Sequence, residues 1–330
     1  SWNGSIRQYN NGAMDGFVTT NNPEGERAMA YLEEADLPFY YDLAGAFAIA
    51  DHYHASLLGP TMPNRFYMMG ATSYGLIHNR LVLPDTRATP VDNLYLRLEA
   101  AGFQWKDYAG GARPLGLFPY FGIQRSETRA HLATLDELAQ DLRTGNLPAF
   151  ATINPSFSGT GGDRVDEHPP GMPQMGSRWV ESIVRAVMAS PAWPSTALII
   201  TYDEHGGFAD HVPPPAACAP GDYEPTRDPD DLPGRFDRLG FRVPFIVVSP
   251  YARRHYVSHR VYDHSSVVRF VEARFGLPAM TALDANATPI HDLFDFTRAP
   301  DTSLPNLRPS AVPADAQARC RATWPSVSAF

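Results

Sequence analysis

An apolar segment of the sequence leads directly into a group of residues with affinity for metal ions and phosphate. The segment Ala197–Tyr202 is a short, continuous apolar run, which is typical of a buried strand. The residues that follow it are Asp203, Glu204, His205, Asp210 and His211. Ligands of open α/β sheets bind beyond the carboxyl ends of the strands, and two adjacent carboxylates repel each other unless a cation compensates them. The pattern therefore indicates a cation site that includes Asp203 and Glu204.

Two other interpretations of this group are a helix cap with a solvated turn, and a glycosidase carboxylate pair. An apolar strand that delivers so many acidic and imidazole groups within nine residues is unusual for a simple turn. Adjacent residues on a strand point to opposite faces, which suits the two glycosidase roles poorly. The metal site is the preferred hypothesis.

A threonine in a proline-rich turn is the candidate nucleophile. Thr61 lies in the run Gly59–Arg65, and a helix is expected to start near Pro63. A helix N-terminus offers free backbone N–H groups and a positive dipole to a phosphate. An alcohol is a weak nucleophile until a base or a metal lowers its pKa, and the carboxylate cluster could hold that metal. The alternative is that Thr61 only forms hydrogen bonds in the turn or caps the helix.

Two further histidines stand before expected helices. His168 follows Asp166 and Glu167 in a polar loop, and His264 follows Asp263. On spacing alone both signals are weak, because such residues are more often surface histidines and helix caps.

The chain alternates helices with buried strands, which favours an α/β sheet with helices on both faces. The expected helices are Leu135–Arg143 with Thr134 as N-cap, Ser177–Ala189, and Ser266–Phe275 capped by Ser265 or Ser266. The expected strands are Ala149–Ile153, Ala197–Tyr202 and Val243–Val248. The segment Pro213–Gly240 is rich in proline, aspartate and glycine and is expected to be a long surface excursion.

Composition excludes some classes of partner. The 330 residues carry a formal net charge of −9 and no basic run, which argues against a nucleic-acid-binding protein. No segment is long and apolar enough to be a transmembrane segment, and Ser1 does not begin a signal peptide. Cys218 and Cys320 are the only cysteines, and we expect them to pair if the protein is exported.

Several motifs together resemble the phosphoesterase family that contains bacterial phospholipases C and related acid phosphatases. The two principal matches are Asp203–Pro214 and Gly59–Arg65. Supporting matches, in family order, are Asn11–Phe17, His168–Pro169, Ser190–Trp193, Arg242–Pro244, Ser249–Arg253 and Asp263–Ser266. The set is more specific than any one of its members, and it runs from about residue 11 to about residue 278.

The resemblance implies an alkaline-phosphatase-like α/β fold with a central, mostly parallel sheet in one domain. It implies that Thr61 forms a covalent phosphoryl-enzyme intermediate and that Asp203 and Glu204 bind one or more divalent metal ions of unknown identity. By position, His168 is similar to the family histidine that touches the phosphoryl oxygens. His211 and His264 are further catalytic candidates. We assign Asn64, His131 and His205 to substrate binding, His131 because it lies in a loop before the helix at Leu135.

The resemblance points to phosphate-ester hydrolysis, with phospholipids or phosphomonoesters as substrates. Phospholipase C and acid phosphatase both stay open, and a non-catalytic anion- or metal-binding protein on the same fold is the alternative from another class. A secreted or periplasmic location is implied by the family.

One departure concerns the metal site. Family members carry the block Glu-Asn-Arg-Ser-Phe-Asp after their first strand, where its Glu and Asn complete the metal site, and this chain has no such run. We expect the domain, residues 1–330, to lack its first strand in this chain, and an N-terminal fragment of the same precursor to supply that strand as a second chain. The alternative is a divergent domain that has replaced the strand and its ligands.

Overall fold

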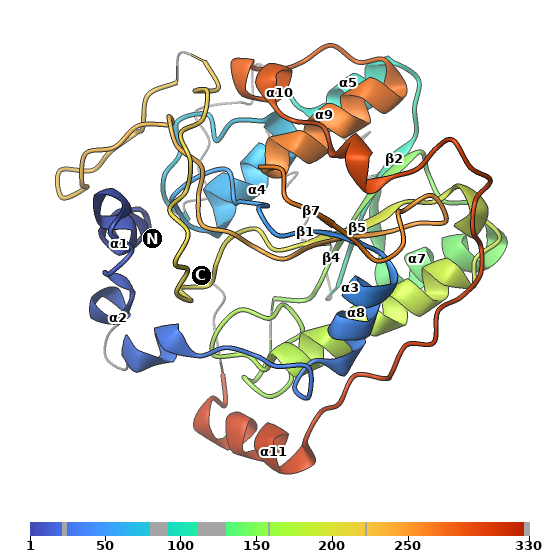
Figure 1. Cartoon of the computed structure of the whole chain (residues 1–330), viewed down its shortest axis with the longest axis horizontal. Helices are drawn as coiled ribbons and strands as arrows, with labels where there is room; N and C mark the ends of the chain where they lie inside the picture. The colour runs from blue at the N-terminus through green and yellow to red at the C-terminus, as the bar shows by residue number, and fades with distance from the viewer. Residues whose placement is uncertain (22–24, 80–91, 111–129, 158, 222, 327–330) are drawn as a thin grey trace.

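The structure is a computed structural model that describes residues 1–21, 25–79, 92–110, 130–157, 159–221 and 223–326 (Figure 1). The α-helices are α1 (Trp2–Tyr9), α2 (Phe17–Thr20), α3 (Pro38–Ala46), α4 (Thr61–Gly70), α5 (Leu94–Ala100), α7 (Leu135–Thr144), α8 (Pro173–Met188), α9 (His264–Phe275), α10 (Ala282–Asn286) and α11 (Ala314–Thr323). The strands are β1 (Ala48–Ala50), β2 (Trp105–Ala109), β3 (Leu132–Thr134), β4 (Phe150–Asn154), β5 (Leu198–Thr201), β6 (Phe245–Val248) and β7 (Tyr256–Ser258).

The described strands form two sheets with helices on both faces. One sheet has the order β5-β6-β1-β7 and the other the order β3-β2-β4. Helices α4, α5 and α9 lie on one side of the strands, and α3, α7 and α8 lie on the other (Figure 1). This arrangement confirms the predicted α/β class with helices on both faces.

Strand direction is parallel in the smaller sheet and mixed in the larger one. Strand β2 pairs in parallel with β3 and β4, and β1 pairs in parallel with β7, but β6 is antiparallel to both β1 and β5. The apolar pattern of β6 could not reveal its direction, because a strand buried on both faces has the same composition in either orientation. All four residues of β6 are buried, whereas those of β5 are only half-buried.

Local capping explains where the helices begin. In α7 the Thr134 hydroxyl accepts from the Glu137 N–H while the Glu137 carboxylate accepts from Thr134, so the predicted N-cap is confirmed. Helix α8 begins at Pro173, before the expected start, because proline is well suited to the first helical position. Helix α9 is capped by Asp263, so the prediction of a serine cap was wrong; Ser266 instead reaches back to the Asp263 N–H.

The main core lies where the helices pack against the larger sheet. The rings of Tyr53 and Phe245 stack with their centroids 4.1 Å apart, and both side chains are almost fully buried. Val247, Val248 and Leu43 complete the centre of this cluster. Each such side chain contributes roughly 1.5–3 kcal/mol through burial, which makes the sheet a rigid support for the loops at its strand ends.

The predicted disulfide between Cys218 and Cys320 is wrong for this structure, in which both are free thiols. Cys320 lies on α11, where its sulfur packs against the backbone at Gly161. Cys218 lies in the 213–240 excursion. Two residues after it, the Pro220 carbonyl accepts from the Ala282 N–H at the start of α10. Helices α10 and α11 lie at opposite ends of the molecule (Figure 1), so the two thiols are held apart. No helix among the described residues has the length and apolar character needed to cross a membrane.

A buried carboxyl pair between α9 and α10 predicts a pH-dependent stability. The Glu272 side chain is fully buried, and burial together with the nearby Asp284 carboxylate raises its pKa to about 8. A carboxyl whose pKa is raised on folding contributes stability at low pH that is lost as the pH rises towards the folded pKa. Between pH 4.5 and 8, titration of Glu272 should lower the free energy of unfolding of the wild type. Glu272→Gln has no carboxyl group at this position, so its free energy of unfolding should fall by about 3 kcal/mol less.

Urea unfolding at a series of pH values measures this difference. The exposed Glu99 on α5 provides the control variant Glu99→Gln, which should follow the wild-type curve. A Glu272→Gln protein with an unchanged pH profile would show that Glu272 is ionised in the native state.

Candidate active site

Strand β5 delivers two acidic residues to the end of the larger sheet, as the sequence predicts. The Asp203 carboxylate accepts from Arg65 Nε at 2.8 Å and from the Glu204 N–H at 3.0 Å. The Glu204 carboxylate accepts from the Gly206 N–H at 2.7 Å and lies 3.3 Å from His205 Nδ1. Burial opposes ionisation of Glu204, but the contacts with His205 and Gly206 outweigh it and lower its pKa to about 2. Glu204 is therefore an anion at neutral pH.

Thr61 is the first residue of α4, and it lies on the face of the helix that points to these carboxylates. Residues four apart in a helix lie one above the other on the same face. Arg65 is four residues after Thr61 and bonds directly to Asp203, so Thr61 lies on the same side of α4. Thr61 is 6% exposed and is therefore a buried polar residue.

Arg65 also joins the two sheets. Its Nη1 donates to Asn154 Oδ1 at 2.9 Å at the end of β4, while its Nε binds Asp203 beyond the end of β5. Asn154 in turn donates to Asp107 of β2 at 2.7 Å. Asp107 is 1% exposed, and burial raises its pKa to about 6 although Thr152, Arg65 and Asn154 act against this.

Arg65, Asn154 and Asp107 are site residues that sequence reasoning missed. Arg65 stands in the same run as Thr61, and its helical spacing from Thr61 was the available signal. Nothing in the local sequence pairs Asn154 or Asp107 with that arginine, because their strands meet it only in the fold.

Asn64 is fully buried beneath the loop that precedes α4. Its Nδ2 donates to the carbonyls of Leu57, Gly59 and Pro60, and its Oδ1 accepts from the Leu57 N–H at 2.9 Å. These bonds fix the loop in front of Thr61. The structure thus gives Asn64 a role in shaping the site, and its predicted contact with substrate stays a prediction.

Two histidines pack tightly beside the carboxylates. His264 is fully buried; its Nε2 lies 2.9 Å from the Asp203 carbonyl and its Nδ1 lies 3.0 Å from the Tyr53 hydroxyl. Burial lowers the pKa of His264, so the ring is neutral, and both ring nitrogens have partners. His205 lies against Phe241, with ring centroids 4.5 Å apart, and its Nε2 lies 2.8 Å from Gln8 Oε1. These contacts orient the strand-end loop.

The loop that carries His168 is fastened to the same strand end. The residue before it, Glu167, accepts from the hydroxyls of Tyr40, at 2.7 Å, and Tyr202. Burial raises the pKa of Glu167 to about 7, although both tyrosine hydroxyls act in the opposite direction. Tyr202 directly precedes Asp203, so this contact fastens the His168 loop to the residue before the carboxylates. A side chain added at Gly206 would lie 3.4 Å from Pro169, which shows how closely the two loops approach.

The structure does not bring every predicted residue to this centre. The His211 side chain is 90% exposed, and its nearest charged partner is Asp210 at 3.9 Å. His131 stacks on Trp105 with ring centroids 4.0 Å apart and precedes β3, whereas the carboxylates follow the end of β5. Asp210 accepts two bonds from Arg242, at 2.7 and 2.9 Å, so it serves as an ion-pair partner in this structure.

Two open cavities flank the loop that carries Asp203 to His211. One has a volume of about 400 Å³ and is lined by Tyr202, His205 and Arg242, among others. The other has a volume of about 340 Å³ and lies between His211, Met29 and Asp15. Both share Ala209 and Asp210, so they lie on either side of one loop.

The strand-end carboxylates offer oxygen ligands to a hard divalent cation, but in the described part of the chain they do not belong to a group of three or more clustered ligand atoms. Asp203 and Glu204 supply carboxylate oxygens, the ligands that such ions prefer, and Glu204 is held ionised. Arg65 provides positive charge to Asp203, so an ion that binds there shares that carboxylate with Arg65 or displaces it.

A family model described as "Phosphoesterase family" matches residues 1–278 of this chain. The chain belongs to the phosphoesterase family. This confirms the resemblance seen in the motifs around Thr61 and Asp203.

Named relatives of this phosphoesterase are phospholipases C. Phospholipase C B of Mycobacterium tuberculosis is 34% identical over 350 residues, which cover 93% of this chain and 65% of that protein. The non-hemolytic phospholipase C of Pseudomonas aeruginosa is 30% identical, with 94% of this chain and 48% of that protein covered. Non-specific phospholipase C6 of Arabidopsis thaliana is 31% identical, with 87% and 57% covered. The chain thus spans from about half to 65% of the length of these relatives.

Solved structures show a weaker likeness. A protein of the alkaline phosphatase superfamily from Vibrio parahaemolyticus aligns with a TM-score of 0.49 at 11% identity, covering 88% of this chain and 79% of that chain. Murine ectonucleotide pyrophosphatase/phosphodiesterase 5 aligns with a TM-score of 0.46 at 11% identity, covering 78% and 95%.

The bonds of Asn64 predict a large loss of stability when they are removed. Asn64→Ala leaves buried backbone groups of the 57–60 loop without partners, so we expect the free energy of unfolding to fall by about 2–4 kcal/mol. Asn286→Ala is the control, because Asn286 is exposed and donates one bond to Ala282; its effect should stay within about 0.5 kcal/mol. Chemical denaturation of both variants tests this, and equal stabilities would show that the loop does not depend on Asn64.

Proposed function

We propose that this chain hydrolyses phosphate esters as a metal-dependent phosphoesterase of phospholipase C type, with Thr61 as the nucleophile. The observation that carries the proposal is the shared face of Thr61 and Arg65 on α4, because Arg65 contacts Asp203. This shared face supports the proposal that the threonine hydroxyl faces the carboxylates at the end of β5.

The site has the features needed to bind a phosphoryl group. The first turn of α4 offers a positive helix end, and the guanidinium of Arg65 lies one turn further along the same face. His168 is proposed to touch the phosphoryl oxygens from the opposite loop. His205 and His264 act as positioning residues, since their ring nitrogens already have protein partners. His211 has the exposure needed to meet substrate at the rim.

The proposed reaction has two steps. Thr61 Oγ1 attacks phosphorus and the leaving alcohol departs, which forms phospho-Thr61; water then hydrolyses this ester and releases phosphate or a phosphomonoester. Asp203 and Glu204 would hold a divalent cation, which when bound would supply positive charge that favours the ionised hydroxyl. The chain's own contribution is to place Thr61 in line and to exclude water around it.

The substrate proposed is a phospholipid, since the named relatives are phospholipases C. Acid phosphatase activity on phosphomonoesters is the alternative within the same chemistry. We also propose that the protein is exported, as the family resemblance implies. The rival from another class, a non-catalytic anion-binding protein, gains support from the Arg65–Asp203 ion pair, because an arginine there supplies charge without a metal.

Replacement of the nucleophile separates catalysis from binding. Thr61→Ala should lower turnover of phosphatidylcholine and of an aryl phosphate by several orders of magnitude, on the order of 10³-fold or more, because no hydroxyl remains to form the covalent intermediate. Initial rates with both substrates, at equal protein and metal concentration, measure this. The control is Thr144→Ala, which removes an exposed hydroxyl at the end of α7 and should leave the rates unchanged. Rates within a few-fold of wild type for Thr61→Ala would exclude the covalent mechanism, and a wild type inactive on both esters would favour the binding protein.

Removal of the strand-end carboxylates should reduce metal content. Asp203→Asn and Glu204→Gln keep the size of each side chain but remove its charge, so each should weaken binding of a divalent ion roughly tenfold or more. Elemental analysis after dialysis against a fixed metal concentration gives the occupancy. Asp315→Asn, at an exposed ion pair on α11, is the control. Full occupancy in both variants would mean that these carboxylates are structural.

A further inference from the structure

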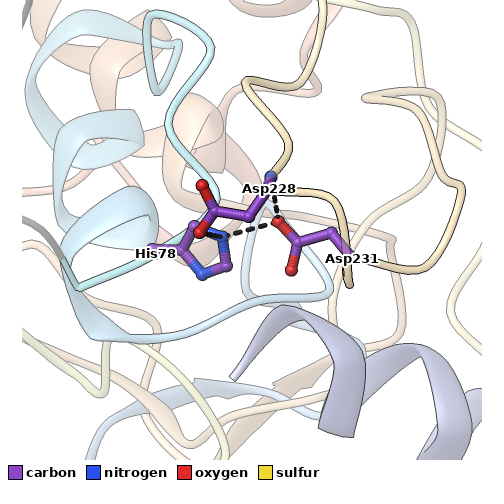
Figure 2. Close-up of side chains that lie close together, drawn as sticks. All are labelled: His78, Asp228 and Asp231. Atoms are coloured by element: carbon purple, nitrogen blue, oxygen red, sulfur yellow. Dashed lines mark hydrogen bonds and ion pairs between the residues drawn. The ribbon is translucent and has the colours of Figure 1, made fainter.

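A second group of potential metal ligands lies outside the site described above. His78, Asp228 and Asp231 each offer one ligand atom, and the three atoms lie within 4.8 Å of one another. Figure 2 shows the imidazole directed towards both carboxylates. His78 comes from the loop after α4, whereas the two aspartates come from the 213–240 excursion. The group therefore joins two segments that are distant in sequence.

The contacts within the group are suited to a cation. His78 Nε2 lies 2.8 Å from Asp231 Oδ2 and 3.7 Å from Asp228 Oδ2. The Asp231 side chain is 5% exposed and that of Asp228 is 42% exposed, so one side of the group is closed by protein and the other is open to water. A site with three protein ligands and an open position is a common arrangement for zinc.

The carboxylate turn is held in place by contacts that do not involve the histidine. Asp231 Oδ2 also accepts from the Asp228 N–H at 2.7 Å, which closes the turn. Trp2 Nε1 donates to the Leu232 carbonyl at 2.9 Å, and Asn3 Oδ1 accepts from the Leu232 N–H at 2.7 Å. The turn is thus fixed against α1, and the Asp231 carboxylate is oriented before any ion binds.

The histidine side of the group reaches the helix that carries Thr61. The residue after His78 is Asn79, whose Oδ1 accepts from the Met62 N–H at 2.9 Å in the first turn of α4. An ion at His78 would therefore hold this segment against the N-terminus of α4.

We propose that His78, Asp228 and Asp231 form a second divalent-metal site that fastens the 213–240 excursion to the N-terminus of α4. One imidazole with two carboxylates is a mixed nitrogen and oxygen set, which suits Zn²⁺ or Mn²⁺ better than Mg²⁺ or Ca²⁺. The role of the site is to join these two segments, and its existence does not depend on the phosphoesterase activity proposed above. The other explanation of the group is a protonated histidine paired with two carboxylates and no metal.

Zn²⁺ binding in a protein that lacks the strand-end carboxylates tests the proposal. In the Asp203→Asn/Glu204→Gln background, equilibrium dialysis with elemental analysis should still show about one Zn²⁺ per chain. Adding His78→Gln should weaken this binding roughly tenfold or more, since glutamine keeps a hydrogen-bond donor for Asp231 but is a poor zinc ligand. Asp231→Asn, added separately, should have the same effect. Mn²⁺ titrated in place of Zn²⁺ should show the same dependence on His78.

The matched control is His259→Ala in the same background. His259 Nδ1 lies 2.7 Å from Asp51 Oδ2 in an exposed pair, so this variant also removes a histidine beside a carboxylate. It should leave Zn²⁺ binding unchanged. Thermal unfolding gives a second readout: Zn²⁺ should raise the Tm of the background protein but not of its His78→Gln derivative. Absence of Zn²⁺ binding in the background protein, or unchanged binding with both His78→Gln and Asp231→Asn, overturns the proposal. Activity of the wild type on phosphate esters is measured separately, so failure here leaves the proposed reaction standing.

Discussion

The bond between Arg65 and Asp203 is the contact on which the rest of the site depends. It connects α4, which begins at Thr61, to the end of β5, and through Asn154 it connects both to the smaller sheet. The Arg65 and Asp203 side chains are 16% and 19% exposed, so water screens their attraction only partly. Removing one partner of such a pair leaves a poorly solvated charge, which is more damaging than the net strength of the pair suggests. The position of α4 relative to the end of β5 is thus held by a guanidinium as well as by packing.

This arginine also limits the electrostatics of the site. Asp203 bonds to it and the more deeply buried Asp107 lies near it, and both carboxylates would repel an anionic substrate. Burial raises the pKa of Asp107 to about 6, which reduces its negative charge in mildly acidic solution. The pKa of Glu204 shifts in the opposite direction, to about 2, because His205 and a backbone N–H stabilise the anion. The chain therefore keeps the Glu204 carboxylate ionised, whereas the charge of Asp107 changes in mildly acidic solution.

The sequence predicts those features of the fold and of the site that depend on residues close together in the chain. The Thr134 cap, the strand before Asp203 and the helix after Asp263 depend on neighbouring residues, and the sequence predicts them. The antiparallel direction of β6, the division into two sheets and the Arg65 network depend on contacts between distant segments, which a single sequence does not display. His211 shows the same limit, because it stands in the motif that follows β5 but its side chain is exposed to solvent. The cysteines were paired on their number and on the export that the family resemblance implies, while the fold places α10 and α11 at opposite ends.

The N-terminus of α4 shows how distant segments finish what local sequence leaves incomplete. The Pro60 side chain cannot accept a bond from the first turn, so the N–H groups there need other acceptors. Pro63 has no N–H and needs none. Asn79 supplies the missing acceptor for the Met62 N–H, from a loop that follows the helix. Asn64 meanwhile fixes the loop before the helix from within it. The backbone on both sides of Thr61 is therefore held by amide side chains, and its position depends on the 57–60 loop and the His78–Asn79 segment together. A change in either segment should move Thr61 relative to Asp203 even if both sheets remain intact.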